Sequence, residues 1–150
     1  MMFSGLNITA SALTAQRLRM DVISSNIANA ETTRGSYVDG QWVPYRRKTV
    51  VLEPKENGFS TYFNKALSSG SPSVGEGVKV SRIQEDESEF QLVYNPDHPD
   101  ANEDGYVLMP NVDLLREMVD LISATRSYEA NVTVFNASKG MLMKALDIGK

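Results

Sequence analysis

Three alternating oxygen-bearing residues have a spacing that could bind a calcium ion. Asp100, Asn102 and Asp104 alternate, and Gly105 stands at the sixth position, as in the first half of a calcium-binding loop. The twelfth position should be a bidentate glutamate, but here it is Asn111, and two prolines precede the loop where a helix should enter. We therefore favour a solvated turn, with a calcium-dependent binding module as an alternative.

The one histidine offers little catalytic chemistry. His98 follows Asp97, and such a pair could act as an acid–base unit, but no nucleophile motif accompanies it. Cysteine is absent, which removes disulfides, thiolate metal sites and cysteine nucleophiles. We predict no catalytic residues, no cofactor, no metal and no enzymatic activity.

Composition narrows the class of partner. The formal net charge is −4, from 15 basic and 19 acidic residues, and the only basic block is Arg46–Lys48, which argues against nucleic acid. No run of 18 apolar residues is present, so no membrane span is expected. The N-terminal residues lack the basic and apolar regions of a secretory signal, so no cleaved signal peptide is expected. A small-molecule substrate is not expected either.

The element that organises the chain is a helical pattern without proline from Val112 to Ile148. Asn111 could cap its start, and the charges from Arg116 to Glu129 would form an outer face that is solvated or, in an assembly, forms pairs between subunits. A helix of that span is about 55 Å long, at about 1.5 Å per residue, and needs a partner. Apolar residues recur at heptad positions. These are Leu114, Leu121, Tyr128, Phe135 and Leu142, with Met118, Val132 and Leu146 four residues after three of them.

A second helical pattern runs from Ser4 to Ala28, with large apolar residues again seven apart: Leu6, Leu13, Met20 and Ile27. Two amphipathic helices at the two ends suggest that the ends pair with each other or with other copies. The predicted fold class is α+β, with terminal helices paired as a coiled-coil-like stalk. Residues 1–30 and 110–150 would form a discontinuous terminal-helix domain, and residues 31–109 a β-rich insert.

Turn residues divide the insert into short strands. Asp39-Gly40 predicts a hairpin turn within Tyr37–Pro44. Further strands are expected within Tyr45–Leu52, Val78–Ile83 and Phe90–Tyr94. The stretch from Asn95 to Asn111, rich in proline, aspartate and glycine, is expected to be extended and irregular.

The two ends together carry a recognisable pattern. Residues 11–17 (SALTAQR) and 20–30 (MDVISSNIANA) resemble the signature of flagellar basal-body rod, hook and related axial proteins. Residues 104–107 (DGYV), 109–113 (MPNVD) and 126–131 (RSYEAN) resemble the proximal rod members of that family in particular. The resemblance implies terminal helices that stack into a tube, and passage of the unfolded chain through the flagellum-specific export apparatus without a cleaved signal.

The resemblance thus implies a structural subunit of the proximal rod in the flagellar basal body, which transmits torque and lines the export channel. Its partners would be other copies of itself, other rod proteins and the export apparatus. The assembly interface would combine the polar positions Asn26, Asn29 and Asn131, expected to bond between helices, with apolar positions. The apolar positions are Leu6, Leu13, Met20, Ile27, Leu114, Met118, Leu121, Tyr128, Phe135 and Leu142. A soluble coiled-coil adaptor or export chaperone is the alternative, and concentration-dependent polymerisation would separate the two.

Phe63 and Leu67 are a candidate export element. Their phenylalanine-x-x-x-hydrophobic spacing resembles the element that early flagellar export substrates use at the export gate. Phe59–Phe63 and Phe90–Tyr94 fit it too, and the alternative is that Phe63 and Leu67 simply cover the insert's core. Deleting residues 63–67 should leave the protein inside the cell while its circular dichroism is little changed. Unimpaired secretion of the deletion would reject this assignment.

Overall fold

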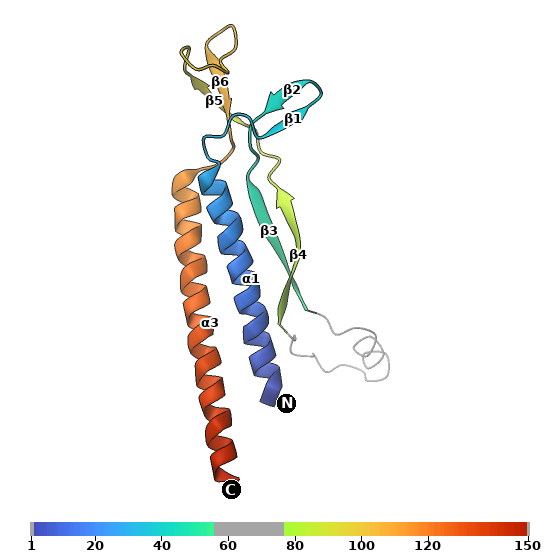
Figure 1. The fold of residues 1–150 in the computed structure, drawn as a ribbon, viewed down its shortest axis with the longest axis vertical. Helices are drawn as coiled ribbons and strands as arrows, with labels where there is room; N and C mark the ends of the chain where they lie inside the picture. Colours follow the sequence, from blue (N-terminus) through green and yellow to red (C-terminus); the bar gives the residue numbers. More distant parts are fainter. Residues whose placement is uncertain (1, 56–76, 150) are drawn as a thin grey trace. The chain divides into compact units, whose positions relative to one another are not determined.

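The computed structural model describes residues 2–55 and 77–149, and its longest elements are helices at the two ends of the chain (Figure 1). Helix α1 spans Met2–Ala28 and helix α3 spans Leu114–Ile148. The described residues between them form six short strands. These elements confirm the predicted α+β class and the two long terminal helices. No helix in the described part of the chain is long and apolar enough to cross a membrane.

The chain divides into two compact units, each containing part of α1, part of α3 and part of the middle. The first comprises the described residues of Met1–Leu18, Val51–Arg82 and Thr125–Lys150, and the second comprises Arg19–Val50 and Ile83–Ala124. Strands β3 (Lys48–Pro54) and β4 (Val78–Glu85) pair as a two-stranded sheet. The predicted domain boundaries at residues 30 and 110, between the terminal helices and the insert, stay a prediction.

In the first unit, Ser11 of α1 holds the start of β4. The Ser11 hydroxyl donates to the Ile8 carbonyl at 2.7 Å and accepts the Val78 amide at 3.1 Å. Gly77, just before the strand, has a φ of +115°, and a Cβ there would overlap the Ser11 hydroxyl. Glycine is therefore required at position 77 both for its backbone conformation and for the space beside α1.

In the second unit, two hairpins follow the helix end. Strands β1 (Ser36–Val38) and β2 (Gln41–Val43) pair antiparallel around Asp39 and Gly40, whose φ values are +51° and +85°. Positive φ at both turn positions is typical of a type I′ hairpin turn. The predicted turn at Asp39-Gly40 is confirmed.

The second hairpin corrects one prediction. Strand β5 (Gln91–Tyr94) pairs antiparallel with β6 (Tyr106–Met109), so the segment from Asn95 to Asn111 is not wholly irregular. The side chain of Asn102 accepts the backbone amides of Asp104 and Tyr106, which closes the loop before β6. Turn residues on both sides disguised a four-residue strand, because its stability depends on pairing with β5.

The start of α3 corrects the prediction that Asn111 caps this helix. The carboxylate of Asp113, rather than Asn111, accepts the amides of Leu115 and Arg116 at 3.0 and 3.3 Å and so caps the helix. Asn111 is buried with Val112 in the core of the second unit. The helix begins two residues later than predicted because Val112 is used for packing. The buried apolar residues of this unit are Val22, Ile23, Val107, Pro110, Val112 and Ala124.

The contact at Gly77 gives a test of the first unit. Gly77→Ala combines backbone strain with steric overlap and should lower the free energy of unfolding by about 2–4 kcal/mol. Gly40→Ala is the matched control, because Gly40 also has positive φ but nothing lies within 4 Å of a Cβ there. It should cost about 1 kcal/mol. Urea unfolding followed by circular dichroism measures both, and equal costs would contradict the proposed overlap.

Candidate functional site

The predicted heptad residues are only partly buried. On α1, Leu6, Leu13, Met20 and Ile27 are half-buried, as are Leu121, Tyr128, Phe135 and Leu142 on α3. Leu114 and Met118 are exposed at 47% and 49% of their surface. Beside the apolar core, the second unit contains a set of largely buried polar side chains that joins α1, the start of β3 and α3.

At the centre of this set is the carboxylate of Glu117, which is 0% exposed. It accepts a hydrogen bond from Asn26 Nδ2 at 2.9 Å and one from Arg47 Nε at 2.6 Å. Asn26 belongs to α1, Arg47 immediately precedes β3, and Glu117 lies in the first turn of α3. Three segments that are far apart in the sequence are therefore joined at one carboxylate.

Asn26 uses every hydrogen-bonding site of its side chain. Its Nδ2 donates to Glu117 and also to the Lys48 carbonyl at 2.8 Å. Its Oδ1 accepts the Lys48 amide at 2.9 Å and the Tyr45 hydroxyl at 3.0 Å. An asparagine side chain offers two donors and two acceptor positions, so all four are filled. Asn26 pairs with the backbone of Lys48 as a neighbouring strand would.

Arg47 extends the cluster through three carboxylates. Besides Glu117, its guanidinium lies 3.4 Å from an oxygen of Asp86 and 3.7 Å from one of Asp120. Arg19 of α1 is a second cation, 3.9 Å from Asp120. Burial lowers the pKa of Arg47, but the hydrogen bonds and charges of Glu117 and Asp86 raise it more, so the net shift is upward and the cation persists.

Asp86 and Asn111 tie the linker between β4 and β5 to the same place. The amide of Arg47 donates to Asn111 Oδ1 at 2.8 Å, and Asn111 Nδ2 donates to the Asp86 carbonyl at 3.0 Å. Hydrogen bonds from the Ser88 backbone and hydroxyl, followed by those of Arg47, lower the pKa of the Asp86 carboxyl against the effect of burial. We call Asn26, Arg47, Asp86, Asn111 and Glu117 the buried polar cluster.

Sequence reasoning found one member of this cluster and misplaced another. Asn26 was expected to bond between helices, and its side chain does reach α3. The side-chain amide of Asn29, just after α1, donates to the Ser25 carbonyl, and that of Asn131 donates to the Ser127 carbonyl in its own helix. Glu117 was expected on a solvated outer face, and its burial makes that prediction wrong.

A signal for Glu117 was present in the sequence. It lies three residues after Leu114 and four before Leu121, so it shares their helix face. A carboxylate on an apolar face indicates a buried partner. Its partner Arg47 could not be identified, because no local pattern connects residues 70 positions apart. The export positions Phe63 and Leu67 lie outside the described residues.

The loop from Asp100 to Gly105, considered above as a calcium-binding loop, is organised by hydrogen bonds within the protein. Thr33 donates to Asp100 at 2.8 Å, and Arg34 donates to it through Nε at 2.8 Å and through Nη2. The Arg34 side chain, then Thr33, lowers the pKa of Asp100, while Asp100 raises the pKa of Arg34. An arginine at this carboxylate would repel a cation. Within residues 2–55 and 77–149, no group of three histidine, cysteine, aspartate or glutamate side chains could hold a metal ion.

The buried polar cluster is chemically closed: its side chains bond to one another and to the backbone. Removing one member leaves a hydrogen-bonding group of each of its partners unsatisfied inside the protein. Glu117→Ala should therefore lower the free energy of unfolding by about 3–5 kcal/mol, and Asn26→Ala by about 1–3 kcal/mol.

Asp120→Ala provides the control, because Asp120 is one-third exposed and makes only long contacts with Arg19 and Arg47. It should cost less than about 1 kcal/mol. Urea unfolding of the three variants decides the ranking, and a Glu117→Ala variant as stable as Asp120→Ala would show that the cluster does not hold the unit together.

The sequence matches two family models and several characterised bacterial proteins. The model described as "Flagella basal body rod protein" matches residues 6–34, and "Flagellar basal body rod FlgEFG protein C-terminal" matches residues 103–148. The flagellar basal-body rod protein FlgC of Bacillus subtilis is 65% identical over 99% of this chain and 98% of its own length. The FlgC proteins of Borreliella burgdorferi and Escherichia coli O6:H1 are 46% and 42% identical, over 98% and 96% of this chain and 97% and 95% of theirs. With such identity along nearly its whole length, the chain belongs to the FlgC family of flagellar basal-body rod proteins.

Proposed function

We propose that this chain is a structural subunit of the proximal rod and that it assembles with other copies and other rod proteins through α1 and α3. The observation that carries the proposal is a stripe of large apolar side chains on the outside of α3. Leu115, Val119 and Ile122 are 76%, 65% and 55% exposed, and their spacing of four and three residues places them on one helix face. Exposed apolar surface of this kind marks a contact site.

The inner face of the same helix segment is already occupied. Glu117, Leu121 and Ala124 have the same four-and-three spacing, and Glu117 and Ala124 are 0% exposed. A surface helix that packs on one side should be polar on the other. The first part of α3 is buried on its inner face yet apolar on its outer face, so the outer stripe is available to a neighbouring subunit. Leu114 and Met118, predicted to belong to the seam, are about half exposed at its border.

The exposed face of α1 has the opposite character. The exposed residues of α1 from Asn7 to Ser24 are small or polar and include no large apolar side chain: Asn7, Ala10, Thr14, Arg17, Asp21 and Ser24. Small side chains let a second helix approach closely. In the proposed assembly, α3 supplies an apolar surface and α1 a polar surface with small side chains at Ala10, Thr14 and Ser24, where another subunit can pack. The two surfaces differ, as a contact that repeats along a tube requires.

Delivery to the rod is a further part of the proposal. The chain would pass unfolded through the flagellum-specific export apparatus, without a cleaved signal peptide, and take its place in the basal body. The family resemblance supports this route. The absence of cysteine is compatible with it, because no disulfide has to be broken before a chain is threaded. In the assembled rod the subunit would transmit torque and line the export channel.

The outer stripe gives a test that separates assembly from folding. Val119→Asp places a carboxylate at an exposed position, so the free energy of unfolding should stay within about 0.5 kcal/mol of that of the unaltered protein. Desolvating that carboxylate in a helix contact costs several kcal/mol, so basal bodies should lack the protein and cells should lose motility. Leu121→Asp and Phe135→Asp, at half-buried seam positions, should give the same loss.

Asn136→Asp is the matched control, since it adds the same charge at an exposed polar position of α3 next to Phe135. Swimming in soft agar and immunoblots of purified basal bodies are the measurements. Normal motility of the Val119→Asp cells would eliminate the outer stripe of α3 as an interface, and normal motility of the Leu121→Asp and Phe135→Asp cells would eliminate the predicted seam.

A further inference from the structure

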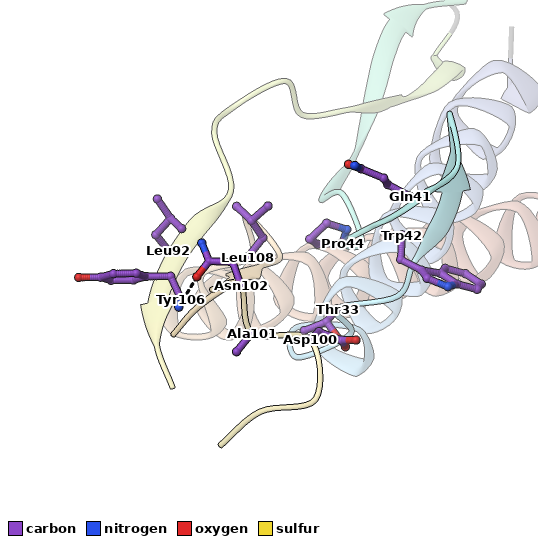
Figure 2. A pocket seen from close by; sticks show the side chains of 10 residues that line it. All are labelled: Thr33, Gln41, Trp42, Pro44, Leu92, Asp100, Ala101, Asn102, Tyr106 and Leu108. Atoms are coloured by element: carbon purple, nitrogen blue, oxygen red, sulfur yellow. Dashed lines mark hydrogen bonds between the residues drawn. The ribbon is translucent and has the colours of Figure 1, made fainter. Parts of the chain in front are cut away.

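The two hairpins of the second unit border a hollow of about 380 Å³ that the buried polar cluster does not use. Figure 2 shows its lining: Leu92 and Leu108 come from β5 and β6, Trp42 and Pro44 from β2 and the residue after it, and Asp100 and Asn102 from the loop before β6. Trp42, Leu92 and Leu108 are 55%, 66% and 48% exposed. The hollow is large enough to receive an aliphatic side chain from another molecule.

The hollow continues into an open apolar sheet face. Leu92 pairs with Leu108 and Tyr94 with Tyr106 across the β5–β6 hairpin, and alternate residues of a strand share a face. The tyrosine rings meet edge to face with centroids 5.3 Å apart. On the other face, Val107 is 2% exposed and belongs to the core. A hairpin packed on one side should be polar on the other. We call Trp42, Leu92, Tyr94, Tyr106 and Leu108 the hairpin surface.

Acidic side chains accompany the hairpin surface. The loop between β5 and β6 carries Asp97, Glu103 and Asp104, all exposed. Asp100 is paired with Arg34, whereas these three form no ion pair with any other described residue. An apolar surface with an acidic border is complementary to an apolar segment that carries cations.

The same chain contains such a segment at the end of α3. Met141, Met143, Leu146 and Ile148 are 67%, 58%, 74% and 86% exposed. Lys139 and Lys144 are exposed among them and form no ion pair within residues 2–55 and 77–149. We call residues 139–148 the α3 end. Helix ends without packing are only marginally stable, so this segment needs a partner.

We propose that the α3 end of one copy docks on the hairpin surface of the next copy, with its lysines facing the acidic loop. This inference rests on the proposed function as a rod subunit. The two surfaces are different, so the contact is head-to-tail and can repeat as an open array instead of closing into a pair. The outer stripe of Leu115, Val119 and Ile122 takes no part in it and is left for lateral contacts.

Disulfide cross-linking tests the contact, and the absence of native cysteine makes each cross-link unambiguous. Cells whose only copy carries both Leu108→Cys and Leu146→Cys should, after basal bodies are purified and oxidised, give a ladder of dimers and longer oligomers. Each single variant should stay monomeric. Leu108→Cys with Leu115→Cys is the matched control, because Leu115 is as exposed as Leu146 but lies outside the α3 end.

Electrostatics give a second readout. Lys139→Glu combined with Lys144→Glu should reduce the cross-linking yield roughly tenfold or more, because like charges would face each other. Adding Asp97→Lys and Glu103→Lys to the same chain should restore it. Arg126→Glu, which reverses an exposed cation elsewhere on α3, should leave the yield unchanged.

The outcomes separate this contact from the proposed function. Leu92→Cys with Leu108→Cys, adjacent across the hairpin, reports whether oxidation has worked. If that control pair forms its disulfide and the protein is present in basal bodies, the absence of a ladder overturns the head-to-tail contact. The proposed function as a rod subunit is then unaffected. A cross-link within one chain, or to a different rod protein identified by mass spectrometry, also overturns it. If the unaltered protein is missing from basal bodies, the proposed function itself fails.

Discussion

The second unit depends on one carboxylate that is wholly removed from water. Glu117 can occupy the interior because Arg47 and Asn26 both donate to it at hydrogen-bonding distance. Its position is fixed at the same time from a helix near the N-terminus, from the residue before a strand and from the first turn of α3. Hydrogen bonds are directional, so this cluster specifies how the three elements approach in a way that apolar packing alone does not.

Hydrogen bonds that fix the approach of the elements suit a protein whose apolar interior is small. The buried apolar residues of the second unit are few, and they come from α1, β6, the segment before α3 and α3 itself. Much of the chain's large apolar surface lies outside, on the outer stripe of α3, at the α3 end and on the hairpin surface. A single-domain protein of this length would bury more of those side chains. Here hydrogen bonds set the geometry of the second unit, and we propose that the exposed apolar surface serves contacts between molecules.

Sequence patterns predicted the elements that are determined by residues close together in the sequence. The helical periodicity located α1 and α3 to within two residues at each end, and Asp39-Gly40 located the β1–β2 turn. Strand β6 was missed because four residues form a strand only when β5 lies beside them. Asn111 was taken for the helix cap because it is a good capping residue, but its side chain bonds to Arg47 and Asp86, which are distant in the sequence. Asn26 was predicted from the family pattern, whereas Arg47 required the fold.

The apolar outer stripe of α3 has a consequence for the cell that makes this protein. A stripe that stays in water until a neighbour covers it also offers a site to any other apolar surface. Free subunits would then be prone to associate wrongly in proportion to their number, and the pool of unassembled chains has to be small. On the proposed assembly, the supply of free subunits would therefore have to be matched to the number of growing structures.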